Sequence, residues 1–402
     1  MTIGDSQLPP PTVSIGPVGW LRQNLFSTWY NALLTVVLVA FLVPLVVVIL
    51  RWIVTEARWG VVTANLRLFL IGQYPFEEAW RIWLSLTMLS VLTGVSAGVY
   101  GGATVRTLAT WLAAGQALLG ALAAVSGLGP AVALALVANT AMVWVAFLLV
   151  RWRPRSVSRR LVGLAWLASI PITVVLLQGI RGLPLPIVTS NLWGGLLLTF
   201  LLAIVGILLS FPFGVLLALG RRSGLPAVRV VSTAYIELIR GVPLVTILFM
   251  AAVMLPLFLP SNVRIDQVLR AMVGITLFSA AYVAENVRGG LQAIPLGQVE
   301  AAHAIGLNTF QTNRFIVLPQ ALRAVIPANV GLFISLLKDT TLVTIVGLLE
   351  LLGIGRAVLA QPQWFGAQLE VYVFIAAVFF VLCYTMSQAS YRLETALGVG
   401  TR

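Results

Sequence analysis

Long runs of apolar residues constrain the fold of this chain more than any other feature. Several of them approach the ~20 residues that an α-helix needs to cross the hydrocarbon core of a bilayer. None shows the sustained alternation of apolar and polar residues that is typical of outer-membrane barrel strands. Only 9% of the 402 residues are charged, against about 25% in soluble domains. The sequence therefore predicts an all-α polytopic membrane protein.

The apolar runs predict about ten transmembrane helices, roughly five in each half of the chain. A cytoplasmic tail at 1–29 is expected before the first span, and we interpret its Pro-rich part, Met1–Trp20, as disordered. The first half, an extension at 30–181, has a polar segment at 51–81 and ends in an irregular linker at 182–192. Its predicted spans are Asn31–Leu50, Ile82–Tyr100, Ala109–Val125, Pro130–Val150 and Leu161–Ile180.

The second half, 193–396, has a polar segment at 289–314 between two apolar runs. Leu342–Ile354 is short for a full crossing, so we predict that it is re-entrant or interfacial. The predicted spans are Gly194–Gly220, Val242–Pro260, Gln267–Glu285, Phe315–Leu337 and Val371–Ser390.

Arginine clusters orient the predicted helices. Arg151–Arg160 holds five arginines and no acid, and by the positive-inside rule it lies in the cytoplasm. Both termini are then cytoplasmic, whereas the four arginines of Arg51–Arg81 are an exception on the outer side. The net charge of +13 follows from these loops. Nucleic acid is not an expected partner, because no basic patch interleaved with aromatic residues is present.

Residue types needed for catalysis are scarce. Cys383 and His303 are the single cysteine and histidine, so neither a disulfide within the chain nor a Cys/His metal cluster is expected. The chain has no Ser/His/Asp set, no paired carboxylates and no GxxxxGK[ST] loop for nucleotide phosphates. We therefore expect neither an enzyme nor a metal site.

The segment EAAHAIGLNTFQTNRFIVLP, Glu300–Pro319, is polar and interrupted by glycine. GQVEAAHAIG predicts a short helix that ends at Gly306, followed by a second helix that leads back into the membrane. Ala301 and Ala302 would offer a face of small residues for close approach, and Gly306 permits a sharp turn. This arrangement suits docking of a partner protein on the cytoplasmic side.

The spacing E-A-A-x3-G-x9-I-x-L-P resembles the cytoplasmic-loop motif of permease subunits of bacterial ABC importers. YIELIRGVPLVTILF, AAYVAENVRGGLQAIPLGQVEAA and LPQALRAVIP are similar to the polar amino acid branch, the histidine/glutamine type. The first half, from QNLFSTWYNALLT onward, is similar to the enlarged permeases of general amino acid importers. The motif is carried by Glu300, Ala301, Ala302, Gly306, Ile316, Leu318 and Pro319.

The resemblance implies a five-helix permease core at 193–396 in the bacterial inner membrane, with a coupling loop at 289–314. A periplasmic binding protein would deliver the amino acid, and a dimer of ATPase subunits, holding ATP and magnesium, would dock at the loop. A second, related permease is implied as well, and a heterodimer is favoured because enlarged permeases come in unlike pairs. No cofactor is expected in this chain.

Charged residues inside predicted spans are costly, so they are candidates for a substrate pathway. An amino acid zwitterion needs an acid for its ammonium group and a base for its carboxylate. Glu237, Arg240, Lys338 and Asp339 offer both, with Thr340 adding a hydroxyl. Glu237 and Arg240 lie three residues apart and could pair with each other.

Three further residues can be interpreted as structural or as part of the pathway. Glu285 and Arg288, also three apart, are interpreted as a structural ion pair. Tyr282 is a candidate for the pathway, and core packing is its alternative role.

Two other functions stay open at this point. An ion-coupled secondary transporter would need no ATPase, but such folds often repeat their discontinuous helices in both halves, whereas the motifs here concentrate in the second. A membrane scaffold that only docks partners would have no need of Lys338 and Asp339.

Overall fold

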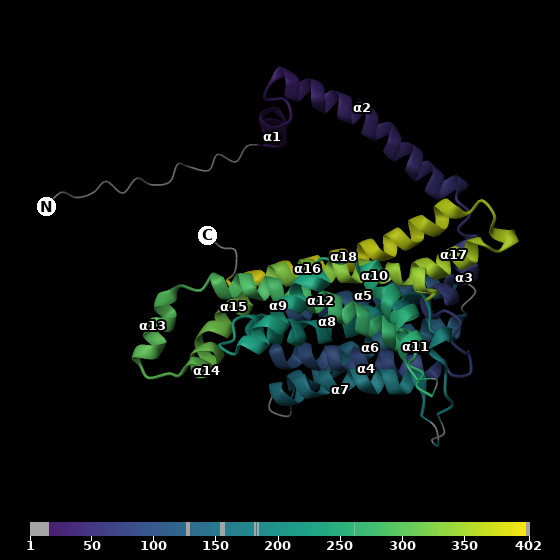
Figure 1. The fold of residues 1–402 in the computed structure, drawn as a ribbon. Coiled ribbons are helices and arrows are strands. Elements are labelled where there is room, and N and C mark those ends of the chain that lie inside the picture. The colour runs from purple at the N-terminus through teal and green to yellow at the C-terminus, as the bar shows by residue number, and fades with distance from the viewer. Residues whose placement is uncertain are drawn as a thin grey trace. The chain divides into compact units, whose positions relative to one another are not determined.

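The computed structural model describes residues 16–125, 129–152, 157–180, 182, 185–260 and 262–398. Within these residues the chain is helical, apart from short turns and isolated backbone bridges (Figure 1). It divides into two units, Met1–Trp59 and Gly60–Arg402, which are described in turn.

The first unit contains α1 (Pro17–Asn24) and α2 (Trp29–Arg51), which continues as a π-helical turn, Trp52–Glu56. Pro17 begins α1 because the first turn needs no amide hydrogen from it. The Thr28 hydroxyl caps α2 by accepting from the Asn31 amide at 3.4 Å. The expectation of disorder over Met1–Trp20 is therefore wrong for Pro17–Trp20, and residues 1–15 lie outside the described part.

The second unit begins with α3 (Gly60–Ile71), within the segment predicted to be a polar loop. The prediction of a loop is wrong here, because the apolar residues of α3 are buried against α8, α17 and α18. Val61 and Phe69 are fully buried, and the Phe69 ring lies 5.1 Å from that of Phe374. Thus α3 precedes the predicted core in sequence but packs on it.

Four long helices complete the extension, and glycines set their packing. They are α4 (Trp80–Tyr100), α5 (Ala103–Val125), α6 (Pro130–Trp152) and α7 (Arg159–Gln178). Gly94 and Gly98 lie one turn apart where α4 meets α6. A Cβ on Gly94 would lie 2.2 Å from the Val143 carbonyl oxygen, so only glycine permits this approach.

The connection after α7 is irregular, as predicted, but it is not a free linker. Ile180 and Leu185 form a backbone bridge, and Ser190–Leu192 form a 3-10 turn. The buried Tyr74 hydroxyl donates to the Leu177 carbonyl at 2.9 Å, and buried Arg81 donates to the Pro186 carbonyl at 2.8 Å. Tyr74, between α3 and α4, and Arg81, in the first turn of α4, therefore fix this connection in place.

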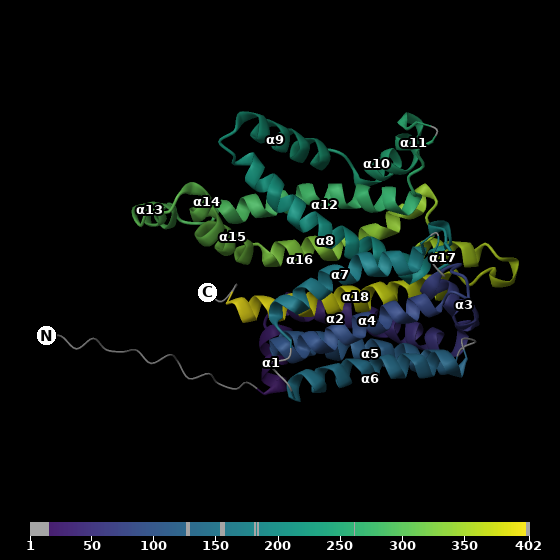
Figure 2. The ribbon, with the colours of Figure 1, turned by 90° about the horizontal axis from the view of Figure 1, so that it is seen from below.

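The core is built around α8 (Gly195–Arg221) and α12 (Gln267–Gln292), which cross closely. A Cβ on Gly214 of α8 would lie 2.5 Å from Val283 of α12, so small residues again allow the contact. Around this pair lie α16 (Ile326–Asp339), α17 (Leu351–Leu359) and α18 (Gln368–Leu397). Figure 2 shows α18 between α16 on one side and α5 of the extension on the other, and α18 contacts both.

A sharp bend separates α9 (Pro226–Arg240) from the run formed by α10 (Leu244–Phe249), a π-helical turn and α11 (Leu255–Phe258). The two parts meet at 105° across Gly241–Pro243. Pro243 lacks an amide hydrogen and disfavours helical geometry at Val242, which explains why one helix ends here and another begins.

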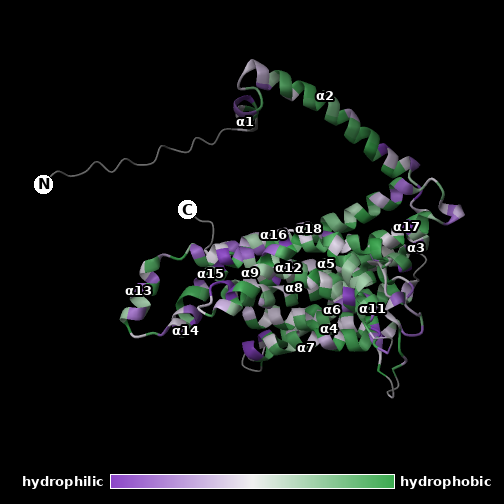
Figure 3. Ribbon diagram, viewed as in Figure 1, coloured by the Kyte–Doolittle hydropathy of each residue, from purple (hydrophilic) through white to green (hydrophobic). Residues whose placement is uncertain are grey.

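Eight helices in the described residues are long and apolar enough to cross a membrane, and the bent pair makes a ninth. Many of their apolar side chains are exposed at the surface, as lipid contact requires. The long helices are coloured mainly as hydrophobic in Figure 3. The prediction of about ten helices agrees with this. The predicted span Ala109–Val125 falls in α5, which is not among the eight although its 23 residues suffice in length.

Two predicted boundaries are wrong. The predicted span Phe315–Leu337 is broken after Ala324, and the continuous apolar segment is Ile326–Val346 instead. The predicted re-entrant stretch Leu342–Ile354 is divided between a 3-10 turn, Thr340–Val346, and α17. Gly347, with φ of 84°, makes the turn between them.

Candidate functional site

The polar segment forms a compact turn of two helices at one end of the core. It consists of α13 (Leu296–Ala304) and α14 (Thr309–Thr312), which extend beyond the neighbouring helices (Figure 1). The Gly306 amide donates to the His303 carbonyl at 2.9 Å, and the Leu307 amide donates to the Ala302 carbonyl at 3.1 Å. These two bonds are a Schellman motif, and the positive φ of Gly306, 86°, is what it demands.

A capping box begins the next helix immediately afterwards. The Asn308 side chain accepts from the Gln311 amide at 2.9 Å, and the Gln311 side chain accepts from the Asn308 amide at 3.0 Å. The sequence A-I-G-L-N-T-F-Q thus ends one helix and starts another within four residues. The predicted helix end at Gly306 is confirmed.

The two alanines of the segment have different surroundings. Glu300 and Ala301 are exposed, whereas Ala302 is buried, with 3% of its surface accessible. The expectation that both alanines form an outer face is therefore wrong for Ala302, which packs into the turn. The outer surface carries exposed apolar residues instead: Leu296, Ile305, Phe310 and Phe315. Such a cluster outside the long helices is typical of a protein contact.

The rest of the motif connects this turn to α12. Ile316 and Leu318 are half-buried and Pro319 is exposed in the first turn of α15 (Leu318–Ala324). A Cβ on Gly290 of α12 would lie 2.4 Å from Val325 and 2.8 Å from the Ala321 carbonyl. Close packing of this kind makes a rigid contact between α15 and α12.

A cluster of five charged side chains joins α8, α9 and α12 in the same core. Arg221 lies 2.9 Å from Glu237 and 3.5 Å from Glu285, and Arg240 also lies 3.5 Å from Glu285. Arg288 completes the cluster, donating from Nε to Glu285 at 2.9 Å. The ion pair predicted between Glu285 and Arg288 is confirmed.

The pair suggested between Glu237 and Arg240 does not occur among the described ion pairs. Each residue instead binds a partner on another helix, because helix packing brings Arg221 and Glu285 between them. The Arg240 guanidinium also lies 5.7 Å from the centre of the Tyr282 ring, a cation–π contact. Arg221 was missing from the sequence-based candidates, although its position at the end of an apolar run was a usable signal.

Lys338, Asp339 and Thr340 lie apart from this cluster. Asn286 of α12 donates to Asn329 of α16 at 3.0 Å, and this bond shows which parts of the two helices lie at the same level along their axes. Lys338 follows nine residues later in α16, about 13 Å further along the axis. Thr340 is fully buried and donates to the Leu337 carbonyl at 2.7 Å, so its hydroxyl is already used within the helix.

Glu350 is a buried carboxylate that sequence reasoning missed. It caps α17, accepting from the Leu352 and Gly353 amides at 2.9 Å and from the Thr344 hydroxyl at 2.8 Å. Burial raises the pKa of this carboxyl above its ordinary value, although the hydrogen bonds oppose the shift. These contacts assign it a structural role.

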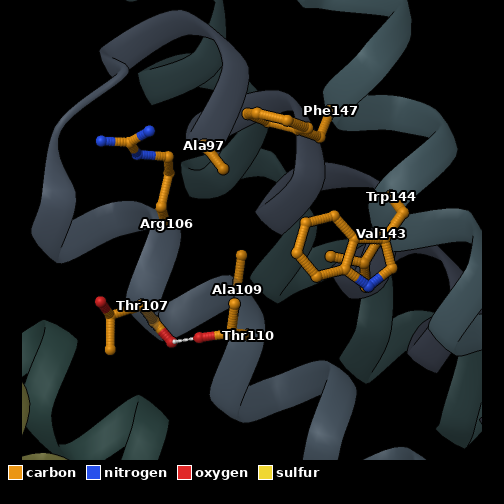
Figure 4. Close-up of a pocket in the computed structure, with 8 residues that line it drawn as sticks. All are labelled: Ala97, Arg106, Thr107, Ala109, Thr110, Val143, Trp144 and Phe147. Carbon is orange, nitrogen blue, oxygen red and sulfur yellow. Dashed lines mark hydrogen bonds between the residues drawn. The ribbon is translucent and has the colours of Figure 1, made fainter.

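Two cavities in the described residues do not suit a zwitterion. One, of about 540 Å³, is lined by apolar residues of α4, α7 and α8, with Ser169 and Thr173 as its hydroxyls. The other, of about 340 Å³, lies between α4, α5 and α6, with Arg106 at its edge (Figure 4). No acidic side chain lines either cavity, so neither offers a partner for an ammonium group.

Comparison with known proteins identifies the family. Residues 210–394 match the model described as binding-protein-dependent transport system inner membrane component. The inner membrane amino-acid ABC transporter permease protein YhdY of Escherichia coli (strain K12) is 37% identical over 396 residues, 95% of this chain and 93% of its own. The chain belongs to the amino-acid ABC transporter permeases.

A second relative supports the assignment, and one solved structure is similar to the core. The glutamate/glutamine/aspartate/asparagine transport system permease protein BztC of Rhodobacter capsulatus is 37% identical over 424 residues, 97% of this chain and 95% of its own. A crystal structure of an amino acid ABC transporter with histidines is 30% identical, with a TM-score of 0.46, and covers 50% of this chain and 92% of its own. The protein is thus a multi-pass membrane permease of an importer, and a separate subunit hydrolyses ATP.

Proposed function

We propose that this permease imports polar amino acids, with the charge cluster of α8, α9 and α12 as part of the pathway. The proposal rests on the surroundings of the Arg240 side chain. Its Nε is buried and has no hydrogen-bond partner among the described residues, while its Nη1 faces Glu285. A substrate carboxylate would satisfy the free donor, and Glu237 or Glu285 would attract the ammonium group.

The three arginines and two glutamates of the cluster carry a net charge of +1. This excess suits an amino acid that brings a carboxylate, and it supports acidic and amide amino acids as the substrate class. BztC, whose name records that class, is similar over 97% of this chain. Lys338 and Asp339 are proposed as a second polar position further along the pathway, and Thr340 has a packing role.

The exposed turn of Glu300, Ala301 and Gly306 is proposed as the docking site for the ATPase subunits, which bind ATP and magnesium. Three observations support this proposal: the turn projects from the core (Figure 1), it carries exposed apolar residues, and α15, which follows it, packs on α12 at Ala321 and Val325. Closure of the ATPase dimer would move α13 and, through α15, would tilt α12 with Tyr282 and Glu285. The proposed hinge between α13 and α15 contains Ile316, Leu318 and Pro319.

The remaining partners follow from the family. A binding protein would deliver the amino acid at the periplasmic side, and a second, unlike permease would complete the pathway. The arginine-rich end of the helices and both termini are proposed to face the cytoplasm of the bacterial inner membrane. The helices of 30–181 are proposed as an extension beside a core at 193–396.

Gentle extraction from the native membrane tests the assembly. Recovery of two ATPase subunits and one second permease for each copy of this chain is the expected result. The matching functional test is Gly306→Asp, which should leave insertion intact but uncouple uptake from ATP hydrolysis. Normal ATP-driven uptake by that variant would contradict the docking proposal.

A further inference from the structure

The cavity between α4, α5 and α6 has an apolar interior and a basic edge. Ala97 of α4, Ala109 of α5 and Val143 and Phe147 of α6 form its apolar walls, and Arg106 forms the edge (Figure 4). Ala97, Ala109 and Val143 are buried, whereas Arg106 is exposed. A cavity built this way has separate places for an apolar chain and for an anion.

The cavity lies at one end of the extension helices. Ala97 is in the last turn of α4, and Arg106 is in the first turn of α5. Arg151, at the end of α6, and Arg159, at the start of α7, belong to the same end of the bundle. The cavity therefore lies where helices leave the hydrocarbon and meet lipid headgroups.

The charge around the cavity is positive. No carboxylate among the described residues lies within ion-pair distance of Arg106. A second arginine, Arg392 of α18, donates to the hydroxyl of Thr107, the residue that follows Arg106. An anion at this edge would be attracted by both side chains.

The shape of the cavity suits a flexible occupant. It is a recess of about 340 Å³ between three helices, with mainly apolar walls. An acyl chain can adapt to such a recess, because its carbon–carbon bonds rotate and it presents only apolar atoms to the walls.

We propose that this cavity binds one anionic phospholipid of the bilayer. Its phosphate would lie at Arg106, and one acyl chain would pack against Ala97, Ala109, Val143 and Phe147. Juxtamembrane arginines are known to favour anionic over zwitterionic headgroups. The lipid would link α5 to α18 through the adjacent Thr107–Arg392 contact.

Native mass spectrometry of the purified full chain tests this site. The chain is titrated with phosphatidylglycerol and with phosphatidylcholine of the same acyl chains. The first phosphatidylglycerol is expected to bind more tightly than phosphatidylcholine, and Arg106→Gln should weaken it about fivefold, the effect of one basic residue near the headgroups. The matched control is Arg160→Gln, which removes an exposed arginine at the same end but outside the cavity.

A second variant tests the apolar part. Ala109→Leu fills the cavity and should reduce binding of both lipids, with helix content measured to verify folding. Equal affinity for the two headgroups, equal loss in Arg106→Gln and Arg160→Gln, or unchanged binding by folded Ala109→Leu would each overturn the proposal.

Discussion

Arg240 and Glu285 lie on different helices of the core, and their side chains approach to 3.5 Å. Arg240 ends α9 just before the 105° bend, and Glu285 lies on α12, which packs through Gly290 on α15, the helix that follows the proposed docking turn. The pair therefore connects the bent span with the helix that the ATPase would move.

A double-mutant cycle at Arg240 and Glu285 should show coupling. Glu285→Gln leaves three arginines facing one glutamate, so it should destabilise the protein by about 1–2 kcal/mol, since the groups are partly solvated. Arg240→Gln should lower amino acid uptake about tenfold, which corresponds to one charge-assisted hydrogen bond. Thermal unfolding and uptake in proteoliposomes measure the two effects. Additive effects in the double variant, or normal uptake by Arg240→Gln, would argue against the pair.

A graded series at Gly306 should separate backbone geometry from surface chemistry. Asn tolerates positive φ and should retain most ATP-driven uptake, whereas Val should lose most of it, because a β-branched residue at φ of 86° is strained. Gly297→Val is the control, since Gly297 lies within α13 in open space. Uptake and ATPase activity are measured together. Equal uptake for the Asn and Val variants would show that the turn does not depend on this conformation.

Tyr74→Phe should cost about 1 kcal/mol, because the Leu177 carbonyl loses its donor. Burial raises the pKa of Tyr74 above its ordinary value of 10.0. Because the folded state holds the proton more tightly, this stabilisation is complete below the unfolded pKa and is lost as pH rises through the folded pKa. The wild type should therefore lose stability more steeply than Tyr74→Phe above about pH 10. Parallel stability profiles at alkaline pH would contradict this.

Glu350→Ala should destabilise the protein by about 2–4 kcal/mol, since two backbone amides and one hydroxyl lose their acceptor. Thr344→Val removes one of these three bonds and should cost about 1 kcal/mol. Thermal unfolding of both variants checks the order. A Glu350→Ala variant as stable as the wild type would mean that water replaces the carboxylate at these donors.

The sequence alone was sufficient for the features that depend on local chemistry. Long apolar runs predict long helices, because in a bilayer each backbone amide must be satisfied within its own segment. The A-I-G-L-N-T-F-Q stretch likewise predicts its own turn, since Gly306 and Asn308 act through neighbouring backbone groups. The motif around Glu300 was enough to indicate the permease family.

Tertiary structure decided the features that depend on which helices meet. Spacing along one helix suggested that Glu237 would pair with Arg240, but helix crossing supplied Arg221 and Glu285 as partners instead. Helix packing also explains α3, whose apolar face is buried because α8, α17 and α18 lie against it. It likewise explains why Ala302 faces inward. Hydrophobic spacing specifies that a surface is buried, whereas the geometry of packing determines what lies against it.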